Sequence, residues 1–526
     1  MIISKRATWI VSFGLFALLI FLVVLIAARG LAGRLEPRIR NEVIQYLEKR
    51  FDSDVELAEL HVEWPGVSPF KLAVTRGHGI YAHVKGKGIS MRFRGSRDVP
   101  PMFAIKSFDF VVDLGSLIEK QKTVHSVTID GMEINIPPKS ERPRLGLGGA
   151  DRPETGVMIE EVQVTNSTLT ILPKEKDKAP LRFDLHRVLF QSAGKGVAMK
   201  YDATLTNAKP PGKIRSKGTF GPWAATQPGN TPIGGEYDFK DADLGVFGGI
   251  AGILHSMGQF DGTLSAINVQ GEASVPDFRL KTSGNPVPLT TRFNVLVDGT
   301  NGNTILQPVV ARLGTTDFTT SGGVIKHEKN AKRAIALSVN MKDGNLRDLL
   351  TLAMKGSPFM EGRISLETKI DIPPLAAKVR EKLLLDGSFR ISQARFLRSR
   401  IQQQINMFSH RGQGRPEIEE TVEVPSGLAG TFRMADEVMT FSSLSFAVPG
   451  AGVDLTGRYN LKDDDVDFHG TLRLQAKVSE TMTGWKRWVL KPIDPFFSKQ
   501  GAGTLLHIQV MGSSKEPTFG LDRNHK

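Results

Sequence analysis

The chain has 526 residues, of which 40% are hydrophobic and 23% are charged, and it contains no cysteine. This composition excludes a disordered tail and a polytopic membrane protein. The absence of cysteine excludes disulfides, iron–sulfur clusters, thiolate zinc sites and cysteine nucleophiles. The net charge of +13 is spread along the chain and forms no dense basic run interleaved with aromatic residues. We therefore expect no nucleic-acid partner.

The first feature in chain order is an uncharged apolar stretch over residues 9–28. At about 1.5 Å per residue, a helix of this length spans roughly 30 Å, the thickness of the hydrocarbon core of a bilayer. The stretch is longer than the apolar region of a signal peptide. We predict an uncleaved transmembrane anchor, with a cleaved signal peptide as the alternative, and a short cytoplasmic segment over residues 1–8. Basic residues flank the anchor on both sides, so charge bias does not fix its orientation.

An amphipathic helix is predicted over residues 29–52, because Ile39, Val43 and Leu47 recur at helical spacing. Two compatible interpretations stay open for this helix. Its apolar side can pack on the sheet that follows, or the helix can lie on the outer face of the membrane with its arginines towards the headgroups.

After residue 55 the period of the apolar residues changes from 3.6 to 2. Ile364 and Leu366, for example, alternate with Ser365 and Glu367. Such alternation is typical of antiparallel sheet with one apolar and one wet face. We predict a mainly β fold: a transmembrane helix followed by a long, antiparallel, repeating β-groove, folded like a taco, with a few short helices. The expected parts are an N-terminal β module over 53–136, a linker over 137–156, a middle β module over 157–342 and a C-terminal β module with helices over 343–526.

A short motif, apolar-x-Gly-x-apolar-x-apolar, recurs at irregular intervals. Its glycines are Gly235, Gly262, Gly271, Gly362, Gly387, Gly430, Gly457 and Gly470. A glycine near a strand start predicts a bulge or a sharp bend. The irregular spacing excludes a fixed-period solenoid and favours a sheet extended by hairpins of unequal length. Helices are predicted over 244–254, 346–354, 397–409 and 480–490.

Motifs of enzymes and metal sites are missing from the sequence: it has no G-x-S-x-G elbow, no Walker A loop and no H-E-x-x-H. The densest acidic run, over residues 463–467, lacks the spacing of a calcium loop and is interpreted as the solvated turn of a hairpin. We therefore expect a protein that is not an enzyme and that has no cofactor and no metal.

Aromatic residues cluster near the C-terminus, in the segment over residues 484–497. On a helix, the first three members of this cluster share one face. The cluster consists of four aromatic residues and one valine: Trp485, Trp488, Val489, Phe496 and Phe497. Two interpretations stay open: a plug that covers the last edge of the sheet, or a segment at a membrane interface.

Five segments, at residues 60–74, 260–278, 383–396, 404–414 and 445–461, follow the anchor and the amphipathic helix. In this order, the chain resembles the AsmA-like family of bacterial envelope proteins, which is related to bridge-like lipid-transfer proteins. The resemblance covers essentially the whole chain. It implies a single-pass anchor in the bacterial inner membrane, with the bulk of the chain in the periplasm as a β-groove. It also implies a part in phospholipid transport and outer-membrane biogenesis.

An apolar groove suits lipids because each CH₂ group of an acyl chain gains about 0.8 kcal/mol on leaving water. We expect the protein to bind or conduct phospholipids and so to serve outer-membrane lipid homeostasis. The alternative is a periplasmic scaffold that affects outer-membrane protein insertion without carrying lipid. Expected partners are phospholipids, the inner membrane and outer-membrane or periplasmic proteins. The predicted lining residues are Ile364, Leu366, Ile370, Val453, Leu455, Tyr459, Leu472 and Leu474.

Overall fold

The structure of the protein is a computed structural model. It describes residues 40–41, 43–45, 47–48, 53–93, 100–119, 122–137, 157–173, 179–194, 196–224, 226–326, 333–374, 378–417, 424–482, 503–514 and 516–522. The predicted anchor, almost all of the predicted linker and the aromatic segment over 484–497 lie outside the described residues. Within the described ranges, no helix has the length and apolar character needed to cross a membrane.

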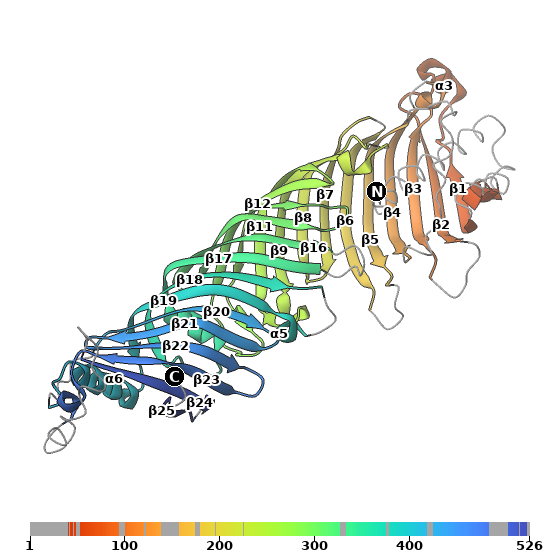
Figure 1. Cartoon of the computed structure of the whole chain (residues 1–526). Helices are drawn as coiled ribbons and strands as arrows, with labels where there is room; N and C mark the ends of the chain where they lie inside the picture. The colour runs from red at the N-terminus through yellow and green to blue at the C-terminus, as the bar shows by residue number, and fades with distance from the viewer. Residues whose placement is uncertain are drawn as a thin grey trace. The chain divides into compact units, whose positions relative to one another are not determined.

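The chain divides into two compact units. The N-terminal unit comprises Met1–Val246, Leu254–Gly271 and Val297–Asn301, and the C-terminal unit comprises Phe247–Ile253, Glu272–Leu296 and Gly302–Lys526. Each unit is built on a long, mainly antiparallel sheet with few helices (Figure 1). The prediction of a mainly β fold is therefore confirmed.

The N-terminal unit contains the first strands of the chain and short helical turns between them. Its elements are β1 (Ser53–Glu63), α3 (Pro69–Thr75), β2 (Tyr81–Phe93), β3 (Phe103–Asp113), η1 (Gly115–Ile118), β4 (Lys122–Ile136), β5 (Val157–Ile171), β6 (Leu181–Gly194), β7 (Met199–Ala208), β8 (Pro211–Phe220), η2 (Pro228–Asn230), β9 (Pro232–Asp243) and η3 (Leu244–Val246). The strand β11 (Ile253–Thr263) and the first part of β12 (Ala266–Val275) also belong to this unit.

The remaining elements belong to the C-terminal unit. They are β10 (Ile250–Ala251), β13 (Arg279–Leu280), β14 (Leu289–Val297), β15 (Thr304–Leu313), β16 (Thr316–Lys326), β17 (Arg333–Asn345), α4 (Leu346–Ala353), β18 (Met360–Ile372), α5 (Val379–Lys382), β19 (Leu384–Phe396), α6 (Ser399–Gly412), β20 (Ser426–Ala435), β21 (Val438–Val448), β22 (Ala451–Asn460), β23 (Asp465–Leu474), η4 (Val478–Thr481), β24 (Thr504–Ser513) and β25 (Thr518–Leu521).

Successive strands of the N-terminal unit pair with one another, and all pairs from β1 to β9 are antiparallel except one. The exception is β4–β5, which is parallel from Lys122↔Val157 to Ile136↔Ile171. The expectation of a wholly antiparallel sheet is wrong at this pair. Parallel neighbours need a crossover connection of about a dozen residues or more, and the predicted linker over 137–156 has that length. The strands on either side of that linker therefore share one sheet.

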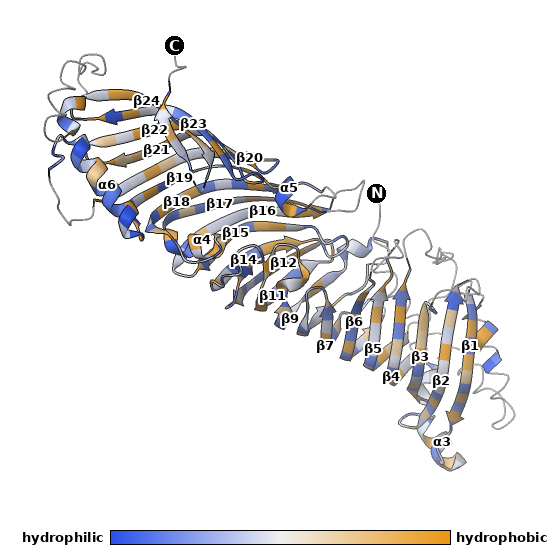
Figure 2. Cartoon of the chain, turned by 90° about the horizontal axis from the view of Figure 1, so that it is seen from below, coloured by the Kyte–Doolittle hydropathy of each residue, from blue (hydrophilic) through white to orange (hydrophobic). Residues whose placement is uncertain are grey.

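The apolar face of β1 to β5 is a closed core. Val84 of β2 is 0% exposed, Ile89 is 1% exposed and Phe110 of β3 is 2% exposed. Two helical residues that precede β1, Val43 and Leu47, belong to the same core. The amphipathic helix predicted over 29–52 therefore packs on the sheet at these two residues. Figure 2 shows the alternation of apolar and polar residues as bands along the strands.

All strand pairs from β15–β16 to β24–β25 in the C-terminal unit are antiparallel. The helices predicted over 346–354 and 397–409 are confirmed as α4 and α6. The helix predicted over 244–254 is wrong, because this stretch forms η3, bends and the start of strands. Its glycines explain the error: Gly249 and Gly252 adopt φ values of 96° and 138°, which no helix contains.

The last described strand, β25, pairs with β24 over four residues and is held at its end by a histidine. His469 of β23 contacts Asp522 through Nδ1 at 2.9 Å from Oδ2, and Asp467 through Nε2 at 3.1 Å from Oδ1. The hydrogen bond to Asp522 is the main reason why the pKa of His469 is raised. A protonated His469 therefore links β23 to the residue that follows β25.

We expect β25 to be held more tightly at about pH 6 than at about pH 9. A raised pKa in the folded state means that the contribution of His469 to stability is fully present below its ordinary pKa of about 6.5. The contribution is lost as the pH rises through the raised value. Hydrogen exchange of the amides of residues 518–521, corrected for intrinsic rates, measures this difference. The difference should vanish in His469→Gln, and equal pH dependence in the variant and the parent would refute the assignment.

Candidate functional site

A row of apolar side chains crosses the C-terminal unit from strand to strand. Directly paired residues of antiparallel strands carry their side chains on the same face of a sheet. Following the register from Leu366 of β18 therefore gives residues of one face. The row consists of Leu366, Phe389, Gly430, Leu444, Leu455, Gly470 and Ile508.

Two further rows run beside the first on the same face. One row consists of Ile364, Ile391, Leu428, Phe446, Val453, Leu472 and Leu506, and the other of Ile370, Leu385, Met434, Met439, Tyr459 and Val466. Leu474 lies two residues beyond Leu472 on β23 and so on this face as well. The register thus brings all eight predicted lining residues together on one surface, which we call the C-terminal apolar face.

The exposure of this face differs from that of the closed core in the N-terminal unit. Ile364 is 6% exposed and lies at the margin where Leu346 of α4 packs. Towards the middle of the face, the side chains of Leu366, Leu455 and Leu472 are half-buried. Side chains in a closed core are fully buried, as Val84 is. The middle of the C-terminal apolar face therefore keeps apolar surface exposed, which is the condition for binding an apolar ligand there.

Four phenylalanine rings on this face lie next to one another in a line. The ring centroids of Phe389 and Phe432 are 6.2 Å apart, those of Phe432 and Phe441 are 6.5 Å apart, and those of Phe441 and Phe468 are 5.7 Å apart. These separations lie in the range of favourable aromatic contacts. These four rings give the face a broad apolar surface that runs across β19, β20, β21 and β23.

The motif glycines make room for these rings. A Cβ atom on Gly430 would lie 2.9 Å from Cε1 of Phe389, and a Cβ atom on Gly457 would lie 2.8 Å from Cδ1 of Phe468. Sequence reasoning predicted bulges or bends at the motif glycines. The β18–β19 register does shift at Gly362, but Gly430 and Gly457 accept aromatic rings from neighbouring strands. The glycine-to-aromatic pairing across strands was missed, because it depends on a register that the sequence does not display.

A related pairing occurs in the N-terminal unit, where tyrosines replace phenylalanines. The hydroxyl of Tyr201 on β7 lies 3.1 Å from Oγ of Ser216 on β8, and the hydroxyl of Tyr237 on β9 lies 3.1 Å from Oγ of Ser256 on β11. Burial raises the pKa of both tyrosines. A Cβ atom on Gly235 would lie 2.9 Å from the Tyr201 hydroxyl. This part of the sheet therefore combines apolar rings with hydrogen-bonded hydroxyls, a feature that sequence reasoning also missed.

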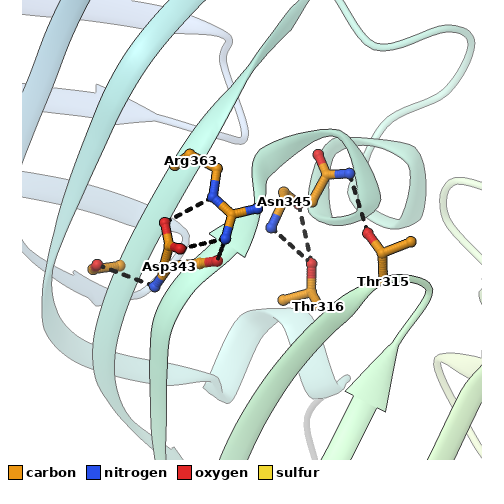
Figure 3. Close-up of polar contacts among 6 residues, drawn as sticks. Thr315, Thr316, Asp343, Asn345 and Arg363 are labelled. Atoms are coloured by element: carbon orange, nitrogen blue, oxygen red, sulfur yellow. Dashed lines mark hydrogen bonds and ion pairs between the residues drawn. The ribbon is translucent and has the colours of Figure 1, made fainter.

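A cluster of polar side chains lies beside α4, and its contacts have a structural role (Figure 3). Asp343 has a φ of 56° at a register shift of β17, and it receives a hydrogen bond from Nε of Arg363 at 2.7 Å. The Arg363 guanidinium lowers the pKa of Asp343. Asn345 caps α4 through its side chain, and its backbone N–H donates to Oγ1 of Thr316 at 2.9 Å. These contacts hold the bulge and the start of α4 in place.

A cavity of about 360 Å³ lies over β17 to β21. Its lining combines five hydroxyl residues and the charged Lys342, Glu367 and Arg390 with residues of the first apolar row, Leu366, Phe389 and Gly430. The hydroxyl residues are Ser365, Ser388, Thr431, Ser443 and Ser445.

Within the acidic run over residues 463–467, Asp463 and Asp464 lie in the turn between β22 and β23, as predicted, whereas Asp465 and Asp467 belong to the start of β23. The Tyr459 hydroxyl donates to Oδ1 of Asp464 at 2.8 Å, and Nδ2 of Asn460 donates to Oδ2 of Asp463 at 2.7 Å. The described part of the chain contains no group of three or more His, Cys, Asp or Glu side chains that could hold a metal ion. The residues predicted as an end plug or interface segment (Trp485, Trp488, Val489, Phe496 and Phe497) lie outside the described residues.

Comparisons with family models, with curated proteins and with solved structures find no match to the chain.

Proposed function

We propose that the chain is a membrane-anchored periplasmic protein of the AsmA-like kind that binds or conducts phospholipids. The observation that carries the proposal is the C-terminal apolar face, two of whose three rows extend from β18 to β24 and whose middle is half-buried. The predicted anchor over residues 9–28 and the resemblance of the sequence segments support the proposed membrane location. The alternative, a scaffold without lipid, requires the apolar face to pack closed, as it does over β1 to β5.

The chemistry of the face suits acyl chains. Leucine, isoleucine, valine and phenylalanine side chains remove CH₂ groups from water at about 0.8 kcal/mol each. The face contributes these side chains row after row, so an acyl chain meets a similar surface at each strand. The headgroup can remain in water beside the sheet and needs no dedicated pocket. This arrangement explains why the contact residues are distributed over many strands rather than gathered in one site.

Photo-crosslinking in cells tests the proposal on the full chain. A photoreactive benzoylphenylalanine at position 455 places the probe on the C-terminal apolar face. The same residue at position 456, whose native threonine is exposed on the opposite face, is the matched control. We expect phospholipid adducts, identified by mass spectrometry, from position 455 and background levels from position 456. Protein adducts in place of lipid adducts at position 455 would support the scaffold instead.

A further inference from the structure

The connection between β1 and β2 exposes a cluster of large apolar side chains. Phe70 of α3 is 78% exposed, Val74 of α3 is 67% exposed, and Trp64, which follows β1, is 42% exposed. We call residues 64–76 the β1–β2 tip. In both views of the chain, α3 projects beyond the ends of β1 and β2 (Figures 1 and 2). The apolar cluster is thus carried on a protrusion of the N-terminal unit.

The base of the tip is firmly attached to the sheet. The backbone N–H of Gly79 donates to Oδ2 of Asp113 at 3.0 Å, and the N–H of His78 donates to the carbonyl of Thr75 at 3.0 Å. A Cβ atom on Gly77 would lie 2.8 Å from the backbone nitrogen of Gly115, so these two backbone segments are in close contact. These contacts hold the C-terminal end of the tip beside β3 and η1, while Phe70 and Val74 stay exposed.

The residue types of the tip match those of a membrane interface. Phe70 and Val74 are four residues apart on α3 and so share one face of the helix. Lys71 and Arg76 are exposed beside them and, within the described residues, make no ion pair. A tryptophan and a phenylalanine with adjacent basic residues form the combination that inserts into the boundary between headgroups and acyl chains. The positive charges complement anionic phospholipid headgroups.

We propose that the β1–β2 tip inserts into the surface of a phospholipid bilayer, with Phe70, Val74 and Trp64 at the acyl boundary and Lys71 and Arg76 among the headgroups. This contact is separate from lipid conduction along the C-terminal apolar face, because the tip can bind a bilayer whether or not that face carries lipid. It would fix the orientation of the N-terminal unit at the membrane. The alternative is that a protein partner covers the same apolar cluster.

A fluorescent probe on the tip tests this insertion. The chain contains no cysteine, so a single Ser68→Cys labels the exposed tip and leaves its apolar side chains intact. Lys200→Cys, at an exposed position of β7, is the matched control. The full chain, labelled with an environment-sensitive dye, is reconstituted in vesicles of phosphatidylethanolamine and phosphatidylglycerol. With brominated acyl chains in the vesicles, we expect quenching of about twofold or more at position 68 and none at position 200.

A second pair of variants identifies the cause of the quenching. Phe70→Ser with Val74→Ser should reduce the quenching at position 68 to the level of the control. The native side chains are exposed, so the fold should be unchanged by circular dichroism. Lys71→Gln with Arg76→Gln should weaken the quenching in anionic vesicles but not in vesicles of phosphatidylcholine.

Solvent-like emission at position 68 in the reconstituted full chain, or quenching that survives the serine variants, would overturn the inference. Tip quenching without lipid adducts at position 455 would leave the tip assignment intact and refute lipid binding by the C-terminal apolar face.

Discussion

Leu455→Asp is expected to lower the yield of lipid adducts from a photoreactive residue at position 444 by about tenfold or more. Leu444 is the direct partner of Leu455 in the β21–β22 register, so a carboxylate at position 455 lies beside the probe on the C-terminal apolar face. An acyl chain that covers an ionised carboxylate must remove it from water, which costs several kcal/mol. A free-energy difference of only about 1.4 kcal/mol already corresponds to a factor of ten.

The fold should survive this substitution. Leu455 is half-buried, so the carboxylate can reach water when no lipid is bound. Thr456→Asp adds the same charge to the opposite, exposed face and should leave the adduct yield at position 444 unchanged. Val84→Asp, at a position that is 0% exposed in the closed core, should instead unfold the N-terminal unit, at a cost of more than about 4 kcal/mol. If Leu455→Asp also unfolded its unit, the face would be a packed core and the account would be wrong.

Gly470→Ala should destabilise the C-terminal unit by about 2–4 kcal/mol, a large effect for the addition of one methyl group. A Cβ atom on Gly470 would lie 1.9 Å from the carbonyl oxygen of Asp454 and 2.8 Å from Cα of Leu455. Both atoms belong to the backbone of the paired strand β22, so the clash cannot be relieved by turning a side chain. The strands would have to separate where the first apolar row crosses them.

Gly452→Ala is the matched control for this prediction. Gly452 lies on β22, opposite Arg473 of β23, and the nearest atom to its added Cβ is 4.0 Å away. Hydrogen exchange of the β22 and β23 amides in the full chain should report loss of protection for Gly470→Ala and no loss for Gly452→Ala. Equal protection in the two variants would show that Gly470 is not required for the close approach of these strands.

The sequence was sufficient to predict a mainly β fold and the apolar face of strands such as β18 and β22. Alternation such as that of Ile364 and Leu366 identifies an apolar face from local periodicity alone, and α4 and α6 follow from local patterns as well. The pairing register of the strands could not be predicted, because it depends on contacts between residues far apart in the chain. The row that joins Leu366 to Leu455 and the rings that cover Gly430 and Gly457 become visible only when the strands are paired.

Two errors have clear physical causes. The stretch over residues 244–254 is apolar enough for a helix, but the positive φ values of Gly249 and Gly252 favour bends. The parallel pair β4–β5 follows from a crossover whose direction cannot be inferred from composition. The exposed Phe70 and Val74 were also missed, because an apolar pair in a short helix resembles core residues until its surroundings are known.

The most direct test of lipid binding by the C-terminal apolar face is a photo-crosslinking scan along β18, one position at a time from residue 365 to residue 370 in the full chain. The β18–β19 register is uninterrupted over this stretch, so successive positions alternate between the two faces of the sheet. We predict phospholipid adducts at positions 366, 368 and 370 and background levels at positions 365, 367 and 369. Adducts that do not alternate, or protein adducts at the positions of the apolar face, would contradict the account.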